Sequence, residues 1–310
     1  MDKVEIVEVG PRDGLQNIGS LVPTAAKIDF IRRLAAAGIK RMEIGSFVSP
    51  KAIPQMSDMD EVVAGLGPLP GLRAMALVPN SKGARRAVAA GLTELIFVIS
   101  MSEAHNMSNV RRPVEASIED FRLTLAEIDP DKRLHIRVGL ATTFHCPFDG
   151  VMDEEQVLRT IHKIARLRDG LEFALSDTTG MALPGHVGRV ARRCIAEFGD
   201  TASWAFHGHD TAGFGIANVL AAFEAGVACF DSSAAGIGGC PFAPGATGNI
   251  ATEDLAYLFA RMGVATGIDL AKLMDAADLA ASFSDTPTGS HALAMPRARL
   301  LSPNGVAAAC

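Results

Sequence analysis

Two histidines lie two residues apart at the end of an apolar run, in the segment AFHGHD. Because successive side chains of a β-strand point to opposite faces, His207 and His209 would share one face of a strand. Two imidazoles on one face can hold a divalent cation together. Structural or surface histidines can show the same spacing, so the pair needs further ligands to indicate a metal site.

In the segment VEVGPRDGLQN an alternating apolar stretch ends at Gly-Pro, and an opposite-charge pair, Arg12-Asp13, follows directly. An ordinary solvated turn would also accept Gly-Pro and such a pair. A second carboxylate, Glu43, lies inside the apolar run MEIGSF. A buried carboxylate is costly unless it is paired or bound to a cation, so Glu43 is expected either in a structural salt bridge or beside a functional site.

A glycine- and proline-rich stretch, GIGGCPFAPGATGN, carries Cys240 and ends at Asn249. We expect a flexible lid with an accessible, catalytic thiol, because inert thiols are usually buried among apolar side chains. Asn249 precedes a predicted helix, so it could cap that helix. Its amide oxygen could also bind a hard cation.

Short β-branched or apolar runs alternate along the chain with longer helical patterns. The strand-like runs are 4–10, 41–47, 73–79, 94–101, 135–143, 171–177, 202–209 and 228–234. The helical patterns are 24–38, 57–66, 81–91, 117–129, 153–169, 184–199, 213–226, 250–263 and 269–283.

This order predicts an α/β fold, a (β/α)8 TIM barrel over residues 1–267 with a short C-terminal helical appendage over 268–310. A doubly wound open sheet is the competing architecture, but it should show GxGxxG after its first strand, and GPRDGLQ does not fit that pattern. In such a barrel the chemistry lies at the C-terminal ends of the strands.

Barrel closure would make the first, seventh and eighth predicted strands neighbours. Asp13, His207, His209 and Asn249 should then meet at one mouth, where their O and N atoms suit Mg²⁺, Mn²⁺, Co²⁺ or Zn²⁺. Arg12 would direct its positive charge into the same mouth.

The composition disfavours other partners. The 310 residues are 48% hydrophobic and 21% charged with a net charge of −6, and no dense Lys/Arg block indicates nucleic-acid binding. No apolar run is long enough for a membrane span, and a first strand starting near Val4 leaves no room for a leader peptide, so we expect a cytoplasmic protein. The spacing of the five cysteines fits a reducing compartment, and the last, Cys310, is expected to be a free thiol.

The segments GPRDGLQN, EIGSFVSPK, HGHDTAGFGIAN and GIGGCPFAPGATGNIATEDL resemble the motifs of the hydroxymethylglutaryl-CoA lyase family, which is related to Claisen-type synthases. The similarity runs from about Val4 to Gly267. It implies retro-Claisen cleavage of a tertiary 3-hydroxyacyl-CoA into acetyl-CoA and a keto acid, with a divalent cation and a homodimeric assembly.

The resemblance also implies roles for individual residues. Arg12 would stabilise the thioester enolate, Glu43 would orient the metal site, and Cys240 would supply acid/base chemistry. His207 could also move a proton, although a metal-bound imidazole is a poor base. The four residues expected to bind substrate are Arg12, Gln16, Asp177 and Thr178.

The chain departs from the family pattern at several strand ends. Ile18-Gly19 replaces the usual Glu-Lys, Ala174 replaces a serine, and SEAHNMSNVRR differs from the usual continuation. The acyl group, which could be that of citramalyl-CoA or a longer 3-alkyl analogue, therefore stays open. Two other functions are possible for such a barrel. A condensing synthase usually has Glu where this chain has Leu15, so Leu15 favours a lyase. A barrel that only binds a ligand would be expected to have lost one of the site residues, and all of them are present.

Overall fold

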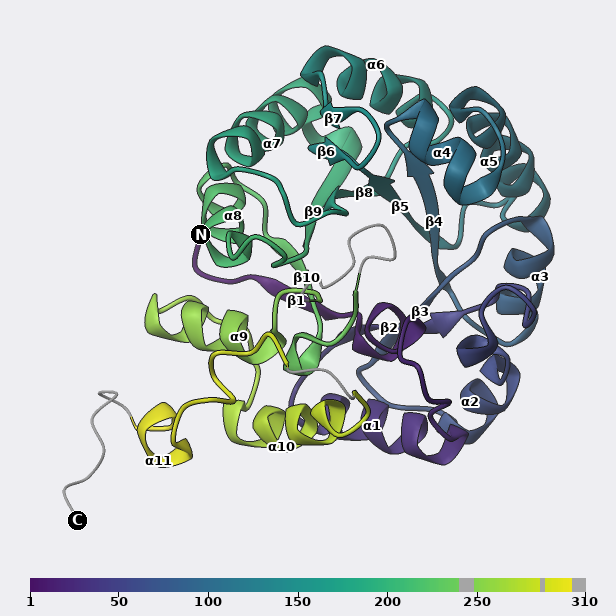
Figure 1. Cartoon of the computed structure of the whole chain (residues 1–310). Helices are drawn as coiled ribbons and strands as arrows, with labels where there is room; N and C mark the ends of the chain where they lie inside the picture. Colours follow the sequence, from purple (N-terminus) through teal and green to yellow (C-terminus); the bar gives the residue numbers. More distant parts are fainter. Residues whose placement is uncertain (240–247, 285–287, 303–310) are drawn as a thin grey trace.

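A closed barrel of parallel strands forms the centre of the computed structural model, which describes residues 1–239, 248–284 and 288–302 (Figure 1). Cys240 and Cys310 lie outside the described residues. Within that part of the chain the order around the barrel is β1-β10-β9-β8-β5-β4-β3-β2. The strands are β1 (Glu5–Glu8), β2 (Arg41–Ser46), β3 (Arg73–Leu77), β4 (Glu94–Ser100), β5 (His135–Ala141), β8 (Leu171–Asp177), β9 (Ala202–Gly208) and β10 (Cys229–Ser232).

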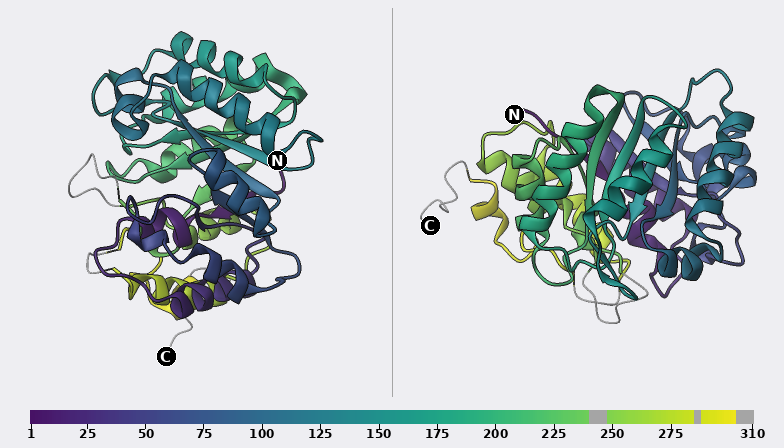
Figure 2. Two further views of the ribbon diagram at one scale, coloured as in Figure 1. Left: turned by 90° about the vertical axis from the view of Figure 1, so that its right-hand side faces the viewer. Right: turned by 90° about the horizontal axis from the view of Figure 1, so that it is seen from above.

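The predicted (β/α)8 barrel is therefore confirmed, and each predicted strand is found. Helices surround the barrel and cover the outer face of its strands (Figure 2). The helices that match predicted ones are α1 (Thr24–Ala36), α2 (Met59–Leu66), α3 (Ser81–Ala89), α5 (Val114–Ile128), α6 (Glu154–Ala165), α7 (Pro184–Phe198), α8 (Gly215–Glu224), α9 (Thr252–Arg261) and α10 (Leu270–Ala281).

Shorter elements lie between the strands and helices of the barrel and after α10. A short antiparallel pair, β6 (His145–Cys146) and β7 (Gly150–Val151), follows β5. Single helical turns are η1 (Gly10–Gly14), η2 (Pro54–Met56), η3 (Gly199–Thr201), η4 (Ala234–Gly236) and α11 (Arg297–Leu300). Helix α4 (Glu103–Val110) was not predicted, and the helix predicted at 117–129 begins earlier, at Val114 after Pro113.

Buried apolar side chains hold these layers together. The main apolar core lies between strands and helices and includes Phe30, Phe173, Phe206 and Phe259. Strands β2, β8 and β10 are buried along their whole length, including charged residues such as Glu43, Glu172 and Asp231. Burying so much apolar surface fixes the strands and thereby the residues at their ends.

The C-terminal helices pack beside the start of the chain. Helix α10 lies along α1, and α11 follows beyond it (Figure 1). The division of the chain after Gly267 stays a prediction. Among the described residues, no helix is both long and apolar enough to cross a membrane.

Candidate functional site

Three side chains with metal-binding atoms meet at the C-terminal mouth of the barrel. Asp13 lies on η1 directly after β1, whereas His207 lies on β9 and His209 just beyond its end. Strand β10 lies between β1 and β9 in the closed barrel. One ligand atom from each of the three residues lies within 4.8 Å of the others. Barrel closure thus brings together residues far apart in the sequence.

Both imidazoles turn the same ring nitrogen toward Asp13. The Nε2 atoms of His207 and His209 lie 3.9 and 3.5 Å from Oδ2 of Asp13. Ligands about 2.1 Å from a common ion lie roughly 3–4 Å from one another. The observed separations therefore suit ligands that share one cation.

Asn249 completes the predicted set. Its Nδ2 donates a hydrogen bond to Oδ2 of Asp13 at 2.8 Å, and its backbone bridges to His209. Its buried Oδ1 has no hydrogen-bond partner among the described residues. An unsatisfied buried carbonyl oxygen is unfavourable, and a hard cation would satisfy it. The donor set present here fits a divalent cation.

The charge environment keeps Asp13 ready to bind a cation. Burial alone would raise the pKa of Asp13, but the positive charge of Arg12 and the two histidines outweigh burial and hold this pKa well below its usual range. The carboxylate is therefore ionised near neutral pH, as a metal ligand must be.

Arg12 is clamped beside this cluster. Its Nε and Nη2 donate to the two oxygens of Glu43 at 2.7 and 2.9 Å, and its Nη1 donates to Asp13 at 2.5 Å. The Glu43 side chain is only 1% exposed. Two parallel hydrogen bonds to a buried carboxylate fix the plane of the guanidinium. Glu43 was expected either in a salt bridge or beside a functional site, and it meets both expectations, because its salt bridge with Arg12 lies beside the candidate site.

The described ends of the glycine-rich stretch lie over the same mouth. Asn17 Nδ2 donates to the carbonyl oxygen of Gly239 at 2.7 Å, and Asp210 N donates to that of Gly248 at 3.1 Å. A Cβ on Gly238 would lie 2.6 Å from Nδ2 of Asn249, and its φ is +128°, so this position requires glycine. The stretch therefore begins and ends in contact with residues around Asp13, His207 and His209.

The three remaining predicted substrate-binding residues lie near the mouth. Gln16 follows η1 and is half-buried. The carboxylate of Asp177 accepts hydrogen bonds from the backbone N–H groups of Met181 and Ala182, both at 3.1 Å. Thr178 Oγ1 accepts one from Thr142 N at 2.8 Å. Asp177 and Thr178 thus fix backbone turns, and their contact with substrate stays a prediction.

Sequence reasoning missed several charged residues inside the barrel, and two of them lie next to the site. Asp231 on β10 faces His207, and Arg137 on β5 binds Asp231. The signal that pointed to Glu43, an ionisable residue within an apolar strand, was present in both HIRVGL and ACFDSS. Their pairing could not be read directly because it depends on the register between strands.

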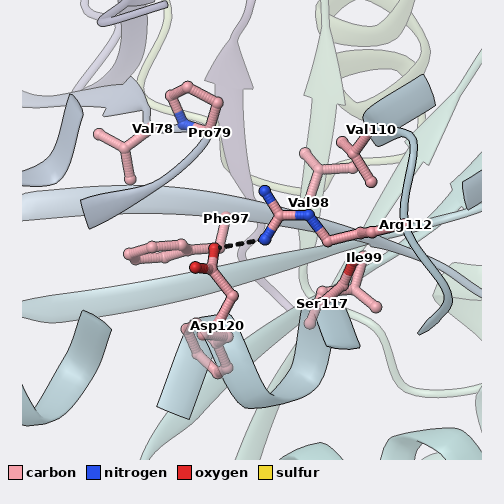
Figure 3. Close-up of a pocket in the computed structure, with 10 residues that line it drawn as sticks. Val78, Pro79, Phe97, Val98, Ile99, Val110, Arg112, Ser117 and Asp120 are labelled. Carbon is pink, nitrogen blue, oxygen red and sulfur yellow. Dashed lines mark ion pairs between the residues drawn. The ribbon is translucent and has the colours of Figure 1, made fainter. Parts of the chain in front are cut away.

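A small pocket lies between the residues that follow β3, strand β4 and helix α5 (Figure 3). An ion pair between Arg112 and Asp120 at 2.8 Å lies across it. Its volume of about 20 Å³ accommodates roughly one water molecule. A thioester substrate cannot enter a pocket of this size.

Curated relatives match nearly the whole chain. The cytoplasmic 3-hydroxy-3-methylglutaryl-CoA lyase of Rattus norvegicus is 39% identical, over 96% of this chain and 86% of its own length. The (R)-citramalyl-CoA lyase of Chloroflexus aurantiacus is 40% identical, over 90% of each chain.

Solved structures agree with these relatives. An HMG-CoA lyase from Acinetobacter baumannii, in complex with coenzyme A and 3-methylmalate, superposes with a TM-score of 0.89 at 39% identity, covering 97% of this chain and 98% of its own. The HMGL-like family model matches residues 3–280. Asp13, His207, His209, Arg12 and Asn249 all lie within that match. Because the match spans most of the chain, the protein belongs to the HMGL-like family of carbon–carbon lyases.

Proposed function

We propose that this protein is a metal-dependent lyase that cleaves 3-hydroxy-3-methylglutaryl-CoA, or a related tertiary 3-hydroxyacyl-CoA, into acetyl-CoA and a keto acid. For the first substrate the keto acid is acetoacetate. The observation that carries the proposal is the cluster of Asp13, His207 and His209, with Arg12 clamped beside it. Retro-Claisen cleavage needs both parts, since it removes a proton from a hydroxyl and leaves an enolate.

Asp13, His207, His209 and Asn249 would hold the cation, with Mg²⁺ or Mn²⁺ first and Co²⁺ or Zn²⁺ as further options. When bound, the cation would acidify the C3 hydroxyl and orient the substrate oxygens. The aspartate and the two histidines make the site one of mixed O and N donors, which does not by itself select one of these ions.

Arg12 would stabilise the negative charge that develops on the thioester oxygen. An arginine has five N–H donors, and its bonds to Glu43 and Asp13 use three of them. Two donors are therefore left for a substrate oxygen. Because Glu43 fixes the guanidinium in advance, little reorganisation is needed when the enolate forms.

Proton transfer would fall chiefly to Cys240, on the glycine-rich stretch that begins and ends over the mouth. A thiol with a pKa near 8.5 exchanges protons close to neutral pH when its surroundings lower that pKa slightly. His207 is the second candidate. We place Gln16, Asp177 and Thr178 with Arg12 around the substrate.

The acyl group at C3 separates the candidate substrates. The relative that acts on citramalyl-CoA and an HMG-CoA lyase are similar to this chain to nearly the same degree, at 40% and 39% identity. A Pseudomonas aeruginosa relative at 38% identity is named for both isohexenylglutaryl-CoA and hydroxymethylglutaryl-CoA. Comparing kcat/KM for acetyl-CoA release from 3-hydroxy-3-methylglutaryl-CoA, citramalyl-CoA and longer 3-alkyl analogues tests the choice. Highest efficiency with the first compound is expected, and no cleavage of any of them would contradict the lyase proposal.

We also propose a cytoplasmic homodimer. The location is supported by the rat relative whose name includes the cytoplasm, although other relatives are named as mitochondrial. The assembly is supported by the family resemblance. Light scattering during size exclusion should give twice the chain mass of 32.5 kDa, and a single-chain mass would contradict the dimer.

A further inference from the structure

A carboxylate, that of Asp231, contacts the ring nitrogen of His207 opposite to the one that faces Asp13. Asp231 on β10 lies beside His207 of β9 in the register of the barrel. Its Oδ2 is 3.3 Å from Nδ1 of His207, and its side chain is 6% exposed. A carboxylate only accepts hydrogen bonds when ionised, so Nδ1 must be the donor. In the neutral ring the opposite nitrogen, Nε2, carries the lone pair, and this nitrogen faces Asp13.

Asp231 is itself held in place by a buried arginine, Arg137. Arg137 Nη1 donates to Oδ1 of Asp231 at 2.6 Å. The same guanidinium donates to both oxygens of Glu172, at 2.8 and 3.0 Å, and Arg41 also binds Glu172. All four of these side chains are buried inside the barrel. Buried charges of this kind persist only when they are mutually paired, so Arg137 has little freedom to release Asp231.

The second histidine lacks such support. Among the described residues, Nδ1 of His209 is buried without a hydrogen-bond partner. Its backbone is held instead by the bridge to Asn249. The two imidazoles are therefore held differently: among the described residues a side chain accepts from Nδ1 of His207, and none accepts from Nδ1 of His209.

We propose that Asp231, held by Arg137, is a positioning residue that keeps the proton of His207 on Nδ1 and presents Nε2 to the cation. The inference rests on the proposed metal site. Partners of this kind contribute on the order of 10- to 100-fold to metal affinity. The interior charge network thus acts on the chemistry at the mouth through one hydrogen bond.

Asp231→Asn tests this role with almost no change in shape. Arg137 can keep its bond to the amide oxygen, which leaves the amide NH₂ facing Nδ1 of His207. That geometry favours the proton on Nε2 and removes the lone pair from the cation site. Glu94→Gln is the matched control, because Glu94 is a buried partner of Arg41 at 2.7 Å in the same network but does not bind His207.

Two measurements on the full chain decide the inference. Mn²⁺ titration, with free Mn²⁺ followed by electron paramagnetic resonance, should give a Kd about 10- to 100-fold weaker for Asp231→Asn and nearly unchanged for Glu94→Gln. Equal weakening in both variants, or in neither, would overturn the positioning role. Wild-type protein that binds no Mn²⁺ would instead contradict the metal site itself.

The tautomer can be measured without metal. Long-range ¹H–¹⁵N NMR of histidine-labelled protein, at a pH where the ring is neutral, should show the His207 proton on Nδ1 in wild type and on Nε2 in Asp231→Asn. Glu94→Gln should match wild type. A wild-type spectrum with the proton on Nε2 would overturn the inference even if the metal binds.

Discussion

Glu43 holds Arg12 by two hydrogen bonds, from Nε and Nη2 at 2.7 and 2.9 Å, and so fixes the guanidinium beside Asp13. The pair links the end of β1 to the middle of β2. Since the carboxylate is almost fully buried, it fixes a direction for Arg12 that solvent does not disturb. In the proposed reaction this direction is toward the thioester oxygen.

Arg12→Gln should fold and bind Mn²⁺ yet lose activity. Removing one preorganised donor for a developing oxyanion typically lowers kcat on the order of 100- to 1000-fold. Steady-state acetyl-CoA release measures the effect. Arg112→Gln is the matched control, because Arg112 is also paired with a carboxylate, that of Asp120 at 2.8 Å. Near-normal turnover in Arg12→Gln would remove Arg12 from the mechanism.

Cys240→Ser should slow turnover while leaving Mn²⁺ affinity unchanged. A serine hydroxyl is a much weaker acid than a thiol and exchanges protons poorly near neutral pH. Cys194→Ala controls for loss of a thiol elsewhere, because Cys194 is buried on α7, away from the mouth. An unchanged kcat in Cys240→Ser would show that the thiol has no catalytic part.

Two buried glutamates should make stability fall as pH rises. Burial raises the pKa of Glu8 and of Glu253 from 4.5 to about 7. Between these values the folded protein keeps protons that the unfolded chain releases. The free energy of unfolding should therefore fall with rising pH, by up to about 1.4 kcal/mol per pH unit for each carboxyl, and level off above pH 7.

Glu8→Gln tests this pH dependence. Glu8 Oε1 accepts from the N–H groups of Gly10 and Ala234, and Oε2 accepts from Thr252 Oγ1 at 2.7 Å. Glutamine can keep the two backbone bonds and donate to Thr252, as a protonated glutamate would. Urea unfolding should find Glu8→Gln close to wild type at pH 5 and more stable at pH 8. The exposed Glu61→Gln should follow wild type, and a Glu8→Gln curve parallel to wild type would contradict the raised pKa.

The barrel could be predicted from sequence because its strands are buried on both faces and read as separate apolar runs. The shared face of His207 and His209 followed from the two-residue period of a strand. Helix α4 was missed because EAHNMSNV has no clear apolar periodicity. Its one local signal is Ser102, whose side chain caps the helix by accepting from His105 N.

The connections between site residues were harder to predict than the residues themselves. Asp13 and Asn249 could be placed at one mouth by barrel closure, but their 2.8 Å hydrogen bond could not. The approach of Asp231 to His207 depends on the register of β9 and β10, which no local pattern determines.

Acetyl-CoA release from 3-hydroxy-3-methylglutaryl-CoA, before and after removal of bound metal, tests the central claim most directly. Chelator-treated protein should lose activity, because Asp13, His207, His209 and Asn249 are then without their cation, and Mg²⁺ or Mn²⁺ should restore it. Equimolar acetoacetate should accompany the acetyl-CoA. Full activity after complete metal removal, or no cleavage by the metal-loaded protein, would contradict the account.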